Sequence, residues 1–151
     1  MRLRRRRTED GAAAVEFALV LPILLVIVFA IISFGWVFAQ SLALSNSARQ
    51  AARYAAVENR TCDDVKDEAV SASAPLVKLD PTVDPNAVQI SRTTGTPCGV
   101  PATDQPCKDS GDKDNVTVTL TYEAQILVPI VPGLGNTKTL HGTGVFRCEF
   151  S

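Results

Sequence analysis

The residue best placed to do chemistry near the N-terminus is Glu16, a carboxylate at the edge of a long apolar run. From Phe17 to Ala39 this run contains no charged residue. An unpaired charge costs up to about 2.5–3.5 kcal/mol at the centre of a membrane span, and less near its edge. We therefore expect Glu16 either to find a partner or to lie in the lipid headgroup layer.

Four cysteines follow the apolar run, at Cys62, Cys98, Cys107 and Cys148. An even number of cysteines in an exported domain is typical of disulfide bonding. Zinc binding is not indicated, because the sequence has no C-x-x-C spacing and no cluster of histidines. Three pairings are possible. Cys98 and Cys107 flank a single loop rich in Gly, Pro and Asp, so this pair is favoured and leaves Cys62 to join Cys148.

No constellation of residues indicates catalysis, a cofactor or a metal site. His141 is the only histidine, and strand alternation places it opposite the core, with no triad among its neighbours. The segment Asp109–Asn115 resembles a calcium loop, but it lacks the D-x-D-x-D-G spacing and has Leu120 where a bidentate Glu is required. Beyond the N-terminus no basic cluster favours nucleic-acid binding.

The apolar run itself predicts a membrane-spanning helix. Phe17–Ala39 would be about 35 Å long as a helix, enough to cross a hydrocarbon core of about 30 Å. Arginines that flank a span stay in the cytoplasm, and here they precede the run at Arg2, Arg4, Arg5, Arg6 and Arg7. We therefore expect the N-terminus inside and residues from Gln40 onward outside. Pro22 should bend the helix without ending it, and Trp36 suits the outer interface.

Two simple interpretations of the N-terminus compete with a more specific one. The segment could be an uncut signal anchor that holds an extracytoplasmic binding module. It could also be a secretory signal cleaved after Ala39, before Gln40, although its apolar region is longer than the usual 7–15 residues. Cleavage there would also interrupt a helical pattern that continues.

The more specific interpretation comes from the order Gly11, four small or apolar residues, Glu16 and Phe17. This order is similar to the processing signature of type IV pilin precursors of the Tad/Flp branch. The segment GAAAVEFALVLPILL, with FGWVF and SARQAARYAA further on, resembles the TadE-like family of pseudopilins, also called minor pilins. The resemblance extends from about Gly11 to Ala56. Phe17 stands where the major pilins usually have tyrosine.

The resemblance implies a structural, non-catalytic protein of a Tad (type IVb) pilus in the bacterial cytoplasmic membrane. A prepilin peptidase would cut between Gly11 and Ala12 and would recognise Glu16 and Phe17. The other implied partners are pilin-like subunits and the Tad secretion machinery. The new amine on Ala12 could pair with Glu16 of a neighbouring subunit, an attraction of up to about 4 kcal/mol at 4 Å with a dielectric near 20.

The helical pattern continues beyond the span, with neither Pro nor Gly from Gln40 to Val57. Small residues recur every four positions, at Gly35, Ala39, Ala43, Ser47, Ala51 and Ala55. Such a ridge allows a second helix to approach closely. The same residues would equally suit an exposed stalk or a local core, since alanine is the best helix former. Both interpretations stay open for the outer half.

The rest of the chain predicts a small antiparallel domain packed on this helix. A short helix is expected from about Asp63 to Ser73, followed by strands at Ala87–Arg92, Val116–Tyr122, Ile126–Val131 (an edge) and Thr137–Phe150. The last strand should turn Leu140, Phe146, Cys148 and Phe150 inward. The expected fold is thus an α+β membrane protein with a pilin-like spanning helix. Its parts are a leader (residues 1–11), the long helix (12–59) and an exported, disulfide-bonded domain (60–151).

Overall fold

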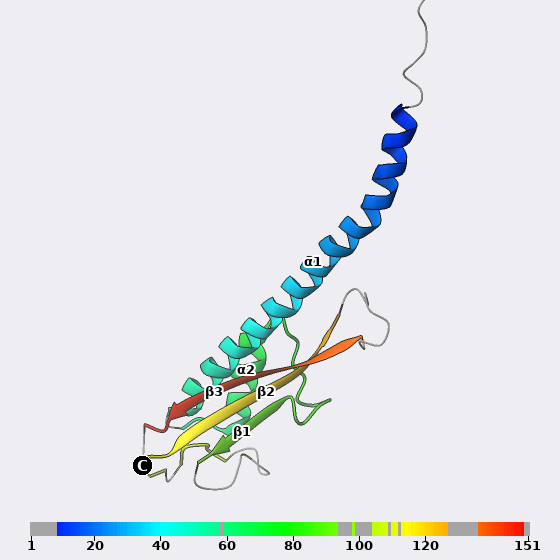
Figure 1. Cartoon of the computed structure of the whole chain (residues 1–151). Helices are drawn as coiled ribbons and strands as arrows, with labels where there is room; N and C mark the ends of the chain where they lie inside the picture. The colour runs from blue at the N-terminus through cyan, green and yellow to red at the C-terminus, as the bar shows by residue number, and fades with distance from the viewer. Residues whose placement is uncertain are drawn as a thin grey trace, which may run out of the picture.

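The computed structural model describes residues 9–57, 59–93, 98, 104–108, 110–111, 113–126 and 136–149. Two helices and three strands make an α+β fold, shown in Figure 1. The elements are α1 (Glu9–Ala55), α2 (Cys62–Ser73), β1 (Val88–Arg92), β2 (Asn115–Gln125) and β3 (Thr137–Arg147).

Helix α1 is the longest element and has two different halves. Its 47 residues correspond to about 70 Å at 1.5 Å per residue. It passes through Pro22 without ending, as expected, and Figure 1 shows it bending gently in its N-terminal part. The N-terminal half projects away from the domain, whereas the C-terminal half lies along it. One continuous helix therefore joins an exposed apolar rod to a packed domain.

The three strands form an antiparallel sheet in the order β1-β2-β3. Helix α1 packs on β3 and β2, while α2 packs on α1 and β1, so both helices cover one face. The alternation predicted for β2 is confirmed: Val116, Val118 and Leu120 are fully buried, and threonines occupy the other face. An uncovered sheet of this size would have too little core, and the helices supply the rest.

Two glycines let β3 approach α1 more closely than a side chain would allow. A Cβ added at Gly142 would lie 2.6 Å from the carbonyl oxygen of Leu44, and one at Gly144 would overlap the carbonyl of Ala48. Strand and helix are thus in backbone contact at both positions. Phe146 pairs with the buried Val116 and so lies on the face that the helices cover, but it is 39% exposed.

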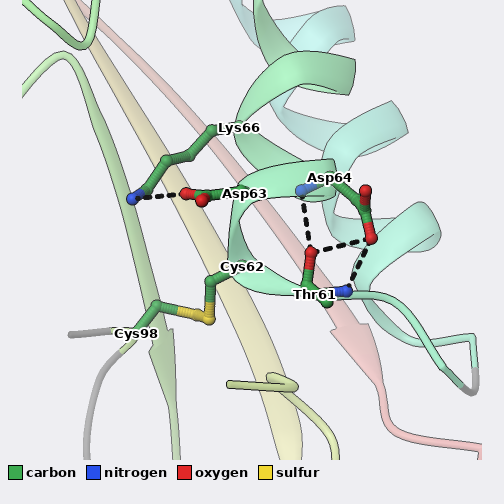
Figure 2. A network of polar contacts seen from close by, with 6 residues as sticks. All are labelled: Thr61, Cys62, Asp63, Asp64, Lys66 and Cys98. Carbon is green, nitrogen blue, oxygen red and sulfur yellow. Dashed lines mark hydrogen bonds and ion pairs between the residues drawn. A yellow bond between two sulfur atoms is a disulfide. The ribbon is translucent and has the colours of Figure 1, made fainter. Parts of the chain in front are cut away.

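Helix α2 begins with a capping box, seen in Figure 2. The Thr61 hydroxyl accepts a hydrogen bond from the Asp64 amide at 3.2 Å, and the Asp64 carboxylate accepts one from the Thr61 amide at 2.9 Å. Both bonds satisfy amides that a helix start would leave without partners. Before them Asn59 has φ 62°, a left-handed conformation that asparagine tolerates, and it ends the turn after α1.

The disulfide pairing differs from the expected one. All four cysteines are bonded, but as Cys62–Cys98 and Cys107–Cys148. The reason is that the loop between β1 and β2 touches two distant elements. The Cys98 amide donates a hydrogen bond to the carbonyl of Ile90 in β1, which brings Cys98 near the start of α2. Cys107 instead lies against the segment that follows β3. Proximity in the sequence was therefore a poor guide.

Some expectations fall outside the described residues. These are the arginine-rich residues 1–8, most of the edge strand expected at Ile126–Val131, and Phe150. Ile126 is described and lies just after β2 rather than in a strand.

Candidate processing and assembly segment

Gly11 and Ala12 lie in the exposed first turns of α1. No side chain or distant backbone atom lies within 4 Å of a Cβ built at Gly11, so this side of the helix is open. The following Ala13 and Ala14 are also exposed. The first turns of α1 thus carry only small side chains from Gly11 to Ala14.

Glu16 and Phe17 lie one helical turn further along the same exposed rod. Phe17 is 65% exposed, and Glu16 has no hydrogen-bond or ion-pair partner among the described residues. The packed domain contacts only the far half of α1, so no group from it neutralises Glu16. Any partner for this carboxylate within the membrane has to come from outside the described part of the chain.

The N-terminal half of α1 exposes an almost continuous apolar surface. Its most apolar 18-residue window is only 6% buried, and the helix is long and apolar enough to cross a membrane. The core helix of a soluble protein would instead be mostly buried. The large apolar residues exposed here are Val15, Phe17, Leu19, Val20, Leu21, Ile23, Leu24, Leu25, Val26, Ile27, Val28, Phe29, Ile31, Ile32, Phe34, Trp36 and Phe38.

The small-residue ridge is divided between these two environments. Ser47, Ala51 and Ala55 are buried in the domain core, and the Ser47 hydroxyl donates to the Ala69 carbonyl of α2 at 2.8 Å. These residues of the outer half thus pack inside the protein's own domain, with Ser47 against α2. Gly35 is exposed, with open space around it. Ala39 and Ala43 lie at the transition and are half-buried.

No catalytic or metal-binding arrangement emerges in the part of the chain that the structure describes. Within it no three His, Cys, Asp or Glu residues gather as metal ligands. His141 lies on the outer face of the sheet, where its Nδ1 is 3.3 Å from the Thr121 hydroxyl. An exposed histidine beside one threonine has neither the nucleophile nor the orienting acid that a hydrolytic site requires.

The residues that sequence reasoning missed are Gly142 and Gly144, which determine how closely β3 approaches the backbone of α1. Their signal was present, because two glycines two positions apart on one strand face mark a close backbone approach.

Comparison with known proteins finds one family. Residues 11–53 match the family model described as TadE-like protein. No curated protein and no solved structure matches the chain. The matched segment begins at Gly11, contains Glu16 and the whole apolar rod, and ends within the part of α1 that the domain holds. Over residues 11–53, less than half of its length, the chain is similar to the TadE-like family.

Proposed function

We propose that this chain is a pseudopilin, or minor pilin, that takes part in assembling a Tad-type (Flp, type IVb) pilus without catalysing a reaction. The observation that carries the proposal is the division of α1. One half is an exposed apolar rod with an unpartnered carboxylate, and the other is locked into a small folded domain. The apolar half of such a molecule can pack among other apolar helices, while the other half carries the folded domain outside them.

The charge pattern gives this rod an orientation. Arginines before the span stay in the cytoplasm, so the sheet and the disulfides lie on the outer side. Both disulfides fit that side, because disulfides persist in oxidising compartments. The chain is then a single-pass membrane protein with its N-terminus in the cytoplasm. Its folded domain lies on the outer side, where it could be incorporated into a pilus.

Processing would convert the anchored precursor into an assembly subunit. A prepilin peptidase cutting between Gly11 and Ala12 removes the arginine-rich leader and leaves an amine on Ala12. Glu16 becomes the fifth residue of the mature chain. Pairing of this carboxylate with the amine of a neighbouring subunit would satisfy both charges in a medium of low dielectric, and it would fix the height of one helix against the next.

The experiment is an intact-mass measurement of the protein extracted from membranes that contain the peptidase. We expect a mature N-terminus at Ala12, and retention of the leader when Gly11 is replaced by Leu. The variant Gly35→Leu is a matched control, because Gly35 is also an exposed helical glycine with open space around it. This control should still be processed.

The same measurement separates the competing interpretations. A chain that keeps Met1 in these membranes is the uncut anchor of a binding module. A chain that begins at Gln40 is a secreted domain. Either result would refute the proposed processing.

A further inference from the structure

Helix α1 carries two exposed arginines at the edge of its contact with β3, where a Cβ added at Gly144 would lie 2.7 Å from the Arg49 Cα. Arg49 and Arg53 are both exposed, and their spacing of four residues places them one turn apart along one stripe. The opposite side of these turns is buried through Ala51 and Ala55. Among the described residues neither arginine has an ion-pair or hydrogen-bond partner. We call Arg49 and Arg53 the arginine stripe.

Helix α2 carries the opposite charge on its own outer side. Asp63, Asp64 and Asp67 are exposed, whereas Val65 and Ala69 face the core. Asp63 has an ion pair with Lys66 at 3.3 Å and Asp64 belongs to the capping box, as Figure 2 shows. Asp67 has no partner within the described part of the chain. We call these three aspartates the acidic face.

The two charged surfaces lie at the same height along the molecule. Helix α2 runs back along α1, because Ser47 bonds to Ala69 at 2.8 Å and Gln50 bonds to Glu68 at 2.5 Å. Arg49 lies between the two α1 positions of these bonds and is therefore about level with Glu68, one residue from Asp67. Four residues on, Arg53 is about level with Asp63 and Asp64, since both helices rise 1.5 Å per residue.

We propose that copies of this chain associate side by side in the membrane, with the arginine stripe of one copy against the acidic face of the next. In the membrane, before any pairing of Ala12 with Glu16 during assembly, two copies anchored by the same span stand at equal height, so the arginines meet the aspartates without an axial shift. Each copy offers both surfaces, so the contact joins different patches and builds a row or a ring rather than a closed pair. The inference rests on the proposed membrane insertion of α1, but not on leader cleavage.

A second copy accounts for both surfaces, whereas an anionic lipid would account only for the arginines. Arg49 lies ten residues beyond the end of the apolar run, about 15 Å along the helix. That distance exceeds the screening length of about 8 Å at physiological salt. Lipid headgroups would also leave Asp67 without a role.

The test uses full-length chains with two different tags, expressed together in membranes and copurified in mild detergent. Exposed ion pairs are each worth a factor of up to about five in an association constant. We expect Arg49→Glu alone, or Asp67→Arg alone, to lower recovery of the second tag about fivefold. One copy with Arg49→Glu and the other with Asp67→Arg should restore recovery, because every junction then joins opposite charges again.

Controls and contrary outcomes are equally specific. Lys138→Glu and Glu123→Lys make the same charge changes at exposed positions of the sheet and should leave recovery unchanged. Recovery in the wild type should fall in 0.5 M salt. Loss with Arg49→Glu but not with Asp67→Arg would assign the arginines to lipid and overturn the proposal. Failure of the mixed pair to restore recovery would also overturn it, and because leader cleavage plays no part in the assay, the proposed processing would be unaffected.

Discussion

At the scale of single residues, the molecule depends on positions where a side chain is missing. Gly142 and Gly144 allow β3 to lie against the backbone of α1, so the helix is held by direct contact and not by interdigitated side chains. This contact links the membrane rod to the domain. Neither glycine has an unusual backbone conformation. Glycine is required at both positions because a side chain would have no space between β3 and α1.

Replacing Gly144 by Ala should therefore destabilise the domain. Its methyl group would overlap the Ala48 carbonyl, and a helix backbone has little freedom to shift. We expect a loss of about 2–3 kcal/mol in the free energy of unfolding, in the upper range for overpacked cores. Urea unfolding of the detergent-solubilised full chain would measure it. Gly35→Ala, which meets only open space, should be neutral or slightly stabilising, and equal effects of the two changes would contradict the contact.

The start of α2 gives a prediction for acid. The Thr61 amide and then its hydroxyl donate to the Asp64 carboxylate and lower the pKa of Asp64 below its ordinary value. A lowered pKa favours the folded state above the ordinary Asp range, and this contribution is lost as the pH falls through the folded-state value. The midpoint temperature of thermal unfolding of the wild type should therefore fall when the pH is lowered from about 5 to about 3.

The variant Asp64→Asn removes this titration and should show a smaller drop. Asp67→Asn is the matched control one turn further on, since it accepts no hydrogen bond from a described residue. This control should follow the wild type. Equal acid sensitivity of wild type and Asp64→Asn would show that the capping carboxylate does not contribute.

At the scale of elements, the sequence was most informative where a pattern repeats. The alternation of Val116, Val118 and Leu120 predicted β2, and the short helix expected from about Asp63 to Ser73 is α2, Cys62–Ser73. Apolar length predicted α1 as a continuous helix. These features are local, because each residue's own neighbours in the chain determine them.

What could not be predicted depends on contacts between distant segments. The disulfide pairing follows from where the loop between β1 and β2 meets α2 and the C-terminal segment, which no local pattern records. Phe146 was assigned to the core by alternation, and it does lie on the covered face, but alternation did not show that the residue would stay 39% exposed. The dual role of the small-residue ridge was likewise undecidable until the packing of Ser47 and Ala51 was known.

At the scale of the whole molecule, α1 unites two environments in a single rigid element. Its outer half is fixed by the sheet, by α2 and by a core that includes Leu44 and Leu120, while its inner half is exposed apolar surface that carries Glu16 at its edge. A displacement of the rod is therefore transmitted directly to the domain. That coupling suits a subunit whose height among neighbouring helices determines where its domain stands.

The most direct test of this account is the amount of pilus assembled in cells that carry Glu16→Ala in place of the wild-type chain. Glu16 lies outside the packed domain, so the variant should fold, insert and form both disulfides normally. We predict a severe loss of assembled pili, partly recovered with the conservative Glu16→Asp. Wild-type amounts of pili with Glu16→Ala would contradict the claim that this carboxylate pairs one subunit with the next.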